Sequence, residues 1–459
     1  MKRNKNSSLI SLLLLGFTAI PLCSCGLFEE KESVKTYNRG YTMNEVRVAE
    51  SNTFKKLNQI NYLAGNVPSK REITPDEIDS YSNFSNLTYH ALVNNFDGIN
   101  LSYCNIGLYS LMNEMYMASC REDLTQRFDD LLGMNFSYRE LFFDKIMSAN
   151  SYAIGDSTIQ IRNGAFFNNE YQYNQDYIDY LSTFSCEAFQ LNFQNEADKI
   201  VEWANSSVNQ ENFIDKKFLE LTKDTQLYLF STLYFKNAWL NKYLESDNIS
   251  DNFYLNEGGS VKTDFMRHSY MSDSYYDYGT YISVKDYYYN QYASITYLVP
   301  KSVNDNIFEL TKDTNIFVEN KDNLVVNETE YGREYFTINM KTPKFKLTTE
   351  LSFKETLIEL GFADIFEETI DSFKNAFDDP ALTPLDTIYL DKIKQKNEVE
   401  FNEDGTVIKS ISMASMSKGE AAPFHSDTLD VNLNQPFIYI IRDTNDNPIF
   451  VGHVDNPRA

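Results

Sequence analysis

Basic residues are scarce in this chain, and their shortage excludes several kinds of partner. Lysine and arginine number 41 against 66 aspartates and glutamates, which gives a formal net charge of −25. Binding to a nucleic-acid backbone needs clustered basic side chains, so the composition argues against it, and equally against docking to anionic lipid or acidic polysaccharide. Solubility through self-repulsion is the simpler explanation of the charge.

Cysteine and histidine are also scarce. The five cysteines lack metal-ligand spacing, and Cys104, Cys120 and Cys186 remain as an odd set once the N-terminal segment is set aside. We therefore expect buried free thiols, and no metal or cofactor. Only four histidines are present, and the chain has no G-x-S-x-G, H-E-x-x-H or phosphate-loop motif. An enzyme is the weakest functional hypothesis.

The apolar run at residues 9–22 is too short to span a bilayer as a stable helix. It follows a positively charged start and precedes LCSCG at residues 22–26, which together form an export signal. The ending resembles a bacterial lipobox in which Cys25 carries the lipid. We expect a lipoprotein signal peptide over residues 1–24 and a bacterial membrane anchor, with the cell surface as one open location. An ordinary signal peptide is the alternative.

Residues 25–72 are expected to form a linker or tether with some helical content, which holds the fold away from the membrane. The length of 459 residues allows one large domain or two medium ones. No internal repeat or low-complexity tract follows residue 73, and an aromatic fraction of 15% provides for a large core.

End signals and periodicity predict helices early in this region and strands late. Thr74-Pro75-Asp76-Glu77 has the cap, proline and acids of a helix start, and the helical pattern continues to about residue 92. Two more helices are expected over 108–132, ending at Gly133, and over 350–360, ending at Gly361. The expected strands are 226–239, buried on both faces, 344–347, 388–401, and a hairpin of 436–443 with 449–454.

Residues 403–435 do not fit a compact domain. A connection of about thirty residues without clear structure is unusual, and such loops tend to be functional. Its first half nevertheless alternates like a strand, with Thr406, Ile408 and Ser410 on one face. The segment is either a disordered loop or a loop that can become a strand.

Six motifs, in order and with compatible spacing, resemble those of the serpin family over about residues 73–457. They are LFSTLYFKNAW at 229–239, PKFK at 343–346, LGFADIF at 360–366, EDGT at 403–406, PF at 436–437 and GHVDNP at 452–457. The resemblance implies an α+β serpin domain over 73–459 with a large central β-sheet, a second smaller sheet, surrounding helices and an exposed reactive-centre loop at about 403–435.

By the same resemblance the protein is a protease inhibitor and not an enzyme. In inhibitory serpins a serine protease, or a cysteine protease, forms an acyl-enzyme with the loop, which then inserts into the central sheet and traps it. Family loop length places the scissile region at Met416, Ser417, Lys418 and Gly419, and Lys418 suggests a trypsin-like target. The implied hinge residues are Glu403, Asp404, Gly405, Thr406, Ile408, Ser410 and Ser412, and the implied sheet gate is Ser231, Trp239 and Gln395.

Three of these positions depart from the family pattern. Ile408 stands where a small residue is usual, Ser231 replaces an asparagine and Gln395 replaces a histidine in the polar cluster that gates the sheet. A bulky Ile408 would slow insertion, since overpacking costs about 1–3 kcal/mol. A non-inhibitory serpin-fold surface or binding protein therefore stays as the alternative. In either case we expect a monomer.

Overall fold

The computed structural model describes residues 36–39, 43, 46, 48, 51, 53–62, 72–155, 157–329, 332–407 and 427–459. Among these residues the largest sheet has eight strands. Seven of them lie in the order β17 (Phe345–Ser352), β18 (Lys394–Asn402), β19 (Gly405–Val407), β8 (Leu227–Ala238), β6 (Ser157–Asn168), β7 (Cys186–Leu191) and β2 (Lys55–Lys56), and β5 (Tyr152–Ile154) pairs with β6.

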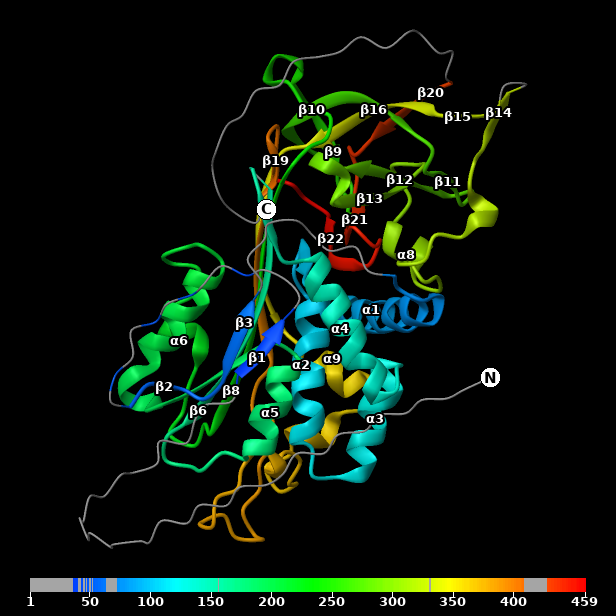
Figure 1. Cartoon of the computed structure of the whole chain (residues 1–459). Coiled ribbons are helices and arrows are strands. Elements are labelled where there is room, and N and C mark those ends of the chain that lie inside the picture. The colour runs from blue at the N-terminus through cyan, green and yellow to red at the C-terminus, as the bar shows by residue number, and fades with distance from the viewer. Residues whose placement is uncertain are drawn as a thin grey trace, which may run out of the picture. The chain divides into compact units, whose positions relative to one another are not determined.

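Two smaller sheets are present in the described part of the chain, where the resemblance implied one (Figure 1). The six-stranded sheet has the order β11 (Tyr275–Asp277), β12 (Tyr281–Tyr287), β13 (Ala293–Pro300), β21 (Phe437–Asp443), β22 (Pro448–Val454) and β4 (Leu101–Tyr103). The four-stranded sheet has the order β20 (Thr428–Asn432), β16 (Phe336–Pro343), β10 (Ser260–Ser272) and β9 (Ile249–Tyr254). Two further pairs are β1 (Thr36–Arg39) with β3 (Gln59–Tyr62) and β14 (Asn327–Thr329) with β15 (Gly332–Glu334).

Helices cover both faces of the central sheet. Neighbouring residues of β6 point to opposite faces, so Phe167 enters the main core and Phe166 enters a second core beneath α6. Figure 1 shows α6 on one side of the sheet and α2 and α5 on the other. The α-helices are α1 (Pro75–Asn95), α2 (Asn105–Ala118), α3 (Glu122–Leu132), α4 (Phe136–Ala149), α5 (Gln175–Thr183), α6 (Phe193–Ser207), α7 (Lys216–Leu219), α8 (Ile307–Thr311) and α9 (Lys354–Glu359).

The expected helix after Thr74 is confirmed. Thr74 and Glu77 cap α1 reciprocally, as the sequence indicates. The pattern over 108–132 is two helices, because the chain leaves helical geometry at Ser119 before α3 begins, and Gly133 ends α3 in the left-handed region. No helix of the described part of the chain is long and apolar enough to cross a membrane.

The strand predictions are right in place and less exact in length. The hairpin β21–β22 is confirmed. β18 begins six residues later than expected at Lys394, and residues 350–352, expected to be helical, extend β17. β8 was expected to be buried on both faces, and it has buried side chains on both: Phe230, Thr232 and Tyr234 on one face and Phe235 and Asn237 on the other. Its remaining side chains are half-buried.

Two further findings concern the cysteines and the N-terminal segment. Cys104 and Cys186 are buried free thiols as expected, whereas Cys120 is exposed, because it lies just after the end of α2 at the surface. Of the segment expected to be a tether, residues 53–62 pack on the domain and add the two-residue strand β2 to the edge of the central sheet.

Candidate functional site

An opening in the central sheet lies between β8 and β18. These two strands run parallel to each other, because β19 pairs antiparallel with both. Beyond β19, no backbone pairing joins β8 to β18 among the residues that the structure describes. A cavity of about 270 Å³ lies there, lined by β8, β18 and, from α2, Leu111 and Met115. We call the end at β19 the hinge end and the other the far end.

β19 occupies the hinge end as a short wedge. Gly405 lies opposite Ala238 of β8 and Asn402 of β18, and Val407 lies opposite Lys236 and Glu400. Only glycine fits at position 405, since a Cβ there would overlap the carbonyl oxygen of Asn237 and lie 2.8 Å from the Cα of Ala238. β19 itself therefore runs from the hinge end toward the far end, between β8 and β18.

Aromatic side chains hold the wedge from the core side. Thr406 is fully buried, and its Oγ1 accepts a 2.6 Å hydrogen bond from the hydroxyl of Tyr288. The ring of Tyr288 stacks on Trp239, with centroids 5.0 Å apart. Trp239 in turn donates from Nε1 to the carbonyl oxygen of Asn402, 2.9 Å away. The predicted gate residue Trp239 thus bonds the last residue of β18, directly before the predicted hinge.

Glu403 fixes the turn between β18 and β19. Its Oε1 accepts hydrogen bonds from Lys344 Nζ at 2.7 Å and Asn248 Nδ2 at 2.5 Å. Burial alone would raise the pKa of Glu403, but these two donors outweigh it and hold the pKa below its ordinary value. Asp404, next along the chain, is exposed.

The predicted gate residues Ser231 and Gln395 lie on opposite sides of the opening and converge on Gly107 of α2. A Cβ at Gly107 would lie 3.1 Å from Gln395 Nε2 and 3.4 Å from Ser231 Oγ. The Gln395 side chain accepts from the backbone N–H of Cys104 and donates to its carbonyl, and Asn397 Nδ2 donates to Gln395 Oε1 at 2.9 Å. Ser231 Oγ is buried and has no hydrogen-bond partner among the described residues.

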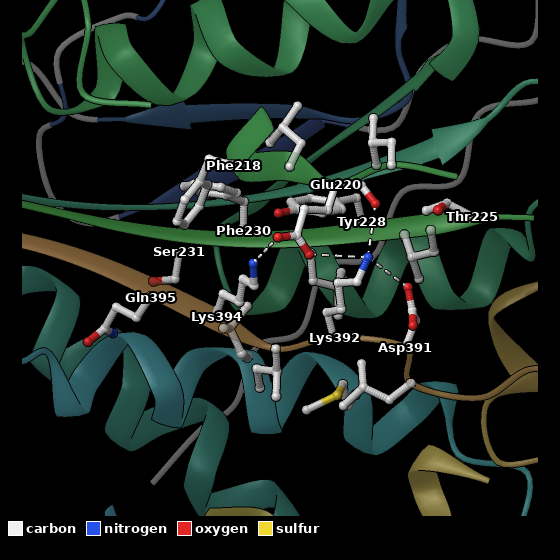
Figure 2. A pocket seen from close by; sticks show the side chains of 18 of the residues that line it. Phe218, Glu220, Thr225, Tyr228, Phe230, Ser231, Asp391, Lys392, Lys394 and Gln395 are labelled. Carbon is white, nitrogen blue, oxygen red and sulfur yellow. Dashed lines mark hydrogen bonds and ion pairs between the residues drawn. The ribbon is translucent and has the colours of Figure 1, made fainter. Parts of the chain in front are cut away.

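Charged side chains cross the far end of the opening (Figure 2). Glu220, in the connection between α6 and β8, forms ion pairs with Lys394 Nζ at 2.6 Å and Lys392 Nζ at 3.3 Å. Lys392 also donates to the backbone oxygen of Glu220 and pairs with Asp391. All these side chains are partly exposed. They join the β8 side of the opening to the β18 side through solvent-accessible contacts.

Several predicted residues lie outside the described residues, so no geometry is assigned to them. The set comprises the anchor residue Cys25, the hinge residues Ile408, Ser410 and Ser412, and the scissile region Met416, Ser417, Lys418 and Gly419. No cluster of three or more metal-ligating side chains is present in the part of the chain that the structure describes.

Sequence reasoning missed several residues of the site. Tyr288 is one of 32 tyrosines and contacts Thr406 from 118 positions away, so no local signal marks it. Gly107 and Asn397 are ordinary polar or small residues within a helix and a strand. Only Lys344 carried a signal, because it lies in the PKFK motif.

Comparison with known proteins supplies the family. The family model described as Serpin (serine protease inhibitor) matches residues 79–457. A serine protease inhibitor of Rattus norvegicus is 23% identical over 98% of each chain, and Serpin-Z2B of Triticum aestivum is 27% identical over 67% of this chain and 77% of its own. The crystal structure of the thermophilic serpin tengpin in its native state has a TM-score of 0.69 at 20% identity, covering 84% of this chain and 96% of tengpin.

The three larger sheets and the pairing of β19 at the hinge end are consistent with the family match. The matched residues make up well over half of the 459. The chain belongs to the serpin family.

Proposed function

We propose that the protein is a protease inhibitor that acts as a suicide substrate. The observation that carries the proposal is the opening between the parallel strands β8 and β18, with β19 already paired at its hinge end. A sheet with unpaired groups on both sides of a gap is stabilised when one more strand fills it. The polypeptide that follows β19 is the strand that can do so.

The register of β19 gives the positions that an inserted loop would take. Extending it one residue at a time puts residue 408 opposite Phe235 and Val399, residue 410 opposite Leu233 and Asn397, and residue 412 opposite Ser231 and Gln395. Serine at 410 and 412 suits these positions, because hydroxyls can bond the amides of Asn397 and Gln395. Ile408 would lie between two fully buried side chains and is the tightest fit.

The length of β8 agrees with the predicted scissile region. The same register brings residue 416 opposite Leu227, the first residue of β8. The 12 residues of β8 span roughly 40 Å. Full insertion would therefore carry whatever is attached near Lys418 to the far end of the sheet.

The chemistry is an acyl transfer that stops halfway. The protease serine Oγ attacks the carbonyl carbon of Lys418 and passes its proton to the protease histidine. The peptide bond to Gly419 then breaks, and the histidine gives that proton to the amino group of Gly419 as it leaves. An ester then joins Lys418 to the protease. Insertion of the loop displaces the enzyme before water can hydrolyse that ester. A cysteine protease would form the corresponding thioester.

The test is covalent complex formation. Mixing the protein with trypsin should give a complex that survives denaturing electrophoresis, and Lys418→Ala should abolish it, whereas the control Lys409→Ala, whose side chain the alternation puts on the outer face, should not. A complex that Lys418→Ala leaves intact with a chymotrypsin-like or elastase-like enzyme would move the scissile bond to Met416. Absence of a complex with every protease of a broad panel would contradict the proposal.

A non-inhibitory binding protein on the same fold is the second candidate, and one observation favours it. The Gln395 side-chain amide forms its hydrogen bonds with the backbone of Cys104 and with Asn397. It therefore bonds the start of α2 and not a group across the opening. On this alternative, cutting the loop leaves the thermal stability unchanged.

We propose further that the protein is exported and anchored to a bacterial membrane by lipid on Cys25, with display at the cell surface. The proposal rests on the sequence of residues 1–26. Metabolic labelling with a fatty-acid analogue should mark the wild type and Cys23→Ser but not Cys25→Ser. Equal labelling of all three would contradict it.

A further inference from the structure

The outer edge of the central sheet is occupied by the chain's own N-terminal segment. Lys55 and Lys56 pair antiparallel with Gln190 and Phe189 of β7, and the N–H of Leu57 donates to the carbonyl of Ala188 at 2.8 Å. An uncovered edge offers a row of free N–H and C=O groups for strand addition. Here a peptide in extended form uses that edge.

Three alternate side chains of this segment each enter a separate, shaped place. The first is Phe54, which is 1% exposed and stacks on Phe189 with centroids 5.3 Å apart. It belongs to the core beneath α6, together with Phe166 and Trp203. A large aromatic ring buried in this way contributes strongly to binding.

The second is Lys56, whose Nζ lies 2.6 Å from Glu187 Oε1. Glu187 is buried, and its other oxygen accepts from Trp203 Nε1 at 3.1 Å and from Arg162 Nη1 at 3.4 Å. Burial would raise the pKa of Glu187, yet Lys56 and Arg162 hold it below its ordinary value. Lys56 therefore supplies part of the charge that compensates a buried carboxylate.

The third is Asn58, which is 1% exposed. Its Nδ2 donates to Ser182 Oγ at 2.8 Å and to the carbonyl of Cys186 at 2.9 Å, and its Oδ1 accepts from the N–H of Ala188 at 2.9 Å. The amide thus bonds the last turn of α5 and the start of β7 at once. The edge of β7 thus recognises an extended peptide with the pattern Phe-x-Lys-x-Asn.

The segment also wraps around the edge from one face of the sheet to the other. Phe54 lies in the core beneath α6, whereas Leu57 and Tyr62 pack against the main core on the opposite face. Ser51 adds a hydrogen bond to Glu196 of α6. We call Ser51 together with residues 53–62 the edge staple. Strands β7, β6 and β8 are continuously paired, so the staple holds the far side of the block that borders the opening.

We propose that the β7 edge is an intramolecular peptide-binding site for the edge staple, and that its occupation restrains widening of the opening between β8 and β18. Widening requires the block of β8, β6 and β7 to move away from β18 and over the helices beneath it. Asn58 bonds both layers at the edge of that block and resists the movement. The consequence for the lifetime of the inhibitory state rests on the function proposed above; the binding site does not.

The first experiment is hydrogen exchange on the full chain. Asn58→Ala should raise exchange in β7 and α5 at least about tenfold, since it removes three buried hydrogen bonds to these elements. Lys56→Ala should raise exchange in β7 and α6 about twofold to fivefold, because the pair with Glu187 is only partly buried. Lys55→Ala is the matched control, with the same charge, the same strand and an exposed side chain, and should change nothing. Native exchange in β21 and β22 verifies that each variant is folded.

The second experiment follows the fraction of protein that still forms the covalent protease complex during incubation at raised temperature. Its half-life should fall for Asn58→Ala and, less, for Lys56→Ala, and stay unchanged for Lys55→Ala. Exchange in β7, α5 and α6 equal to wild type in both Asn58→Ala and Lys56→Ala overturns the site. Faster exchange with an unchanged half-life overturns the restraint. Faster exchange when even the wild type forms no complex supports the site and contradicts the inhibitory function.

Discussion

Different kinds of contact hold the two ends of the opening in the central sheet. At the hinge end the contacts are buried and directional: Thr406 bonds Tyr288, Trp239 bonds the backbone of Asn402, and Gly405 fits against Asn237 with no room for a side chain. At the far end the contacts are ion pairs of Glu220 with Lys392 and Lys394, in reach of water.

This difference separates two tasks. Buried hydrogen bonds and close packing are costly to disturb, so the hinge end decides whether β19 can stay in the sheet. Exposed ion pairs contribute little and are screened by salt, so the far end can part at small cost when a strand arrives. On the proposed mechanism, the sheet is held firmly where insertion would begin and weakly where it would end.

Gly405→Ala is expected to have the largest effect, and it tests whether close packing holds the hinge end. The added Cβ overlaps the Asn237 carbonyl, which should force β19 out of the sheet. Overpacking costs about 1–3 kcal/mol or more, so we expect the yield of covalent complex to fall at least about tenfold. Asp404→Ala is the control, since Asp404 lies next to Gly405 in the chain and is exposed. An undiminished complex in Gly405→Ala would show that β19 is not needed.

Ile408→Ala should act in the opposite direction. If the loop inserts in the register of β19, residue 408 would lie between the fully buried Phe235 and Val399, where a smaller side chain would relieve crowding. We expect fewer inhibitor molecules to be consumed per protease trapped, by a factor corresponding to about 1 kcal/mol. Lys409→Ala, on the other face, is the control and should have no effect. A worse ratio in Ile408→Ala would mean that the inserted register differs.

Tyr288→Phe removes one hydroxyl at the hinge end and leaves Thr406 buried without its partner. The expected loss is about 1–2 kcal/mol, or about 1–3 °C in Tm by calorimetry for a domain of this size. The neighbouring substitution Tyr289→Phe serves for comparison. If both variants melt like the wild type, the hydrogen bond does not hold the wedge.

Acid should weaken the hinge turn through Glu403. Its pKa is lowered in the fold, so the stabilisation is fully present above the ordinary value of 4.5 and is lost as pH falls below it. We expect wild type to exceed Glu403→Gln in unfolding free energy by about 1 kcal/mol at neutral pH and the difference to shrink below pH 4.5. A difference that is constant down to pH 3 would rule out the ion pair with Lys344.

The smallest effect is expected at the far end. Glu220→Ala should change the unfolding free energy by less than about 1 kcal/mol, and the change should vanish at high salt. Lys394→Ala should cost less than Glu220→Ala at low salt, because Glu220 keeps its pair with Lys392. A loss as large as that of Tyr288→Phe would remove the contrast between the two ends.

Much of the hinge end could be predicted from sequence. EDGT after a strand indicates a turn, and alternation groups Thr406 with Ile408 and Ser410 on one face. The family resemblance marks Trp239. Tyr288 and Asn248 could not be predicted in the same way, because they reach the hinge from distant strands and connections.

The far end and the edge staple carry almost no sequence signal. Glu220 meets Lys394 across 174 positions, and a pair of charges on the surface has no characteristic pattern. The staple's strand is only two residues long, too short for a period to show, and its specificity depends on pockets formed by β7, α5 and α6. Such contacts depend on which distant segments the folded chain brings together, and no local sequence pattern marks them.

The most direct test is thermal unfolding before and after a single cut in the loop near Lys418. If the opening between β8 and β18 accepts the cut loop as a central strand, Tm rises by far more than any substitution above changes it. An unchanged Tm, with the cut verified by mass spectrometry, would contradict insertion and leave the protein a binder on a serpin fold.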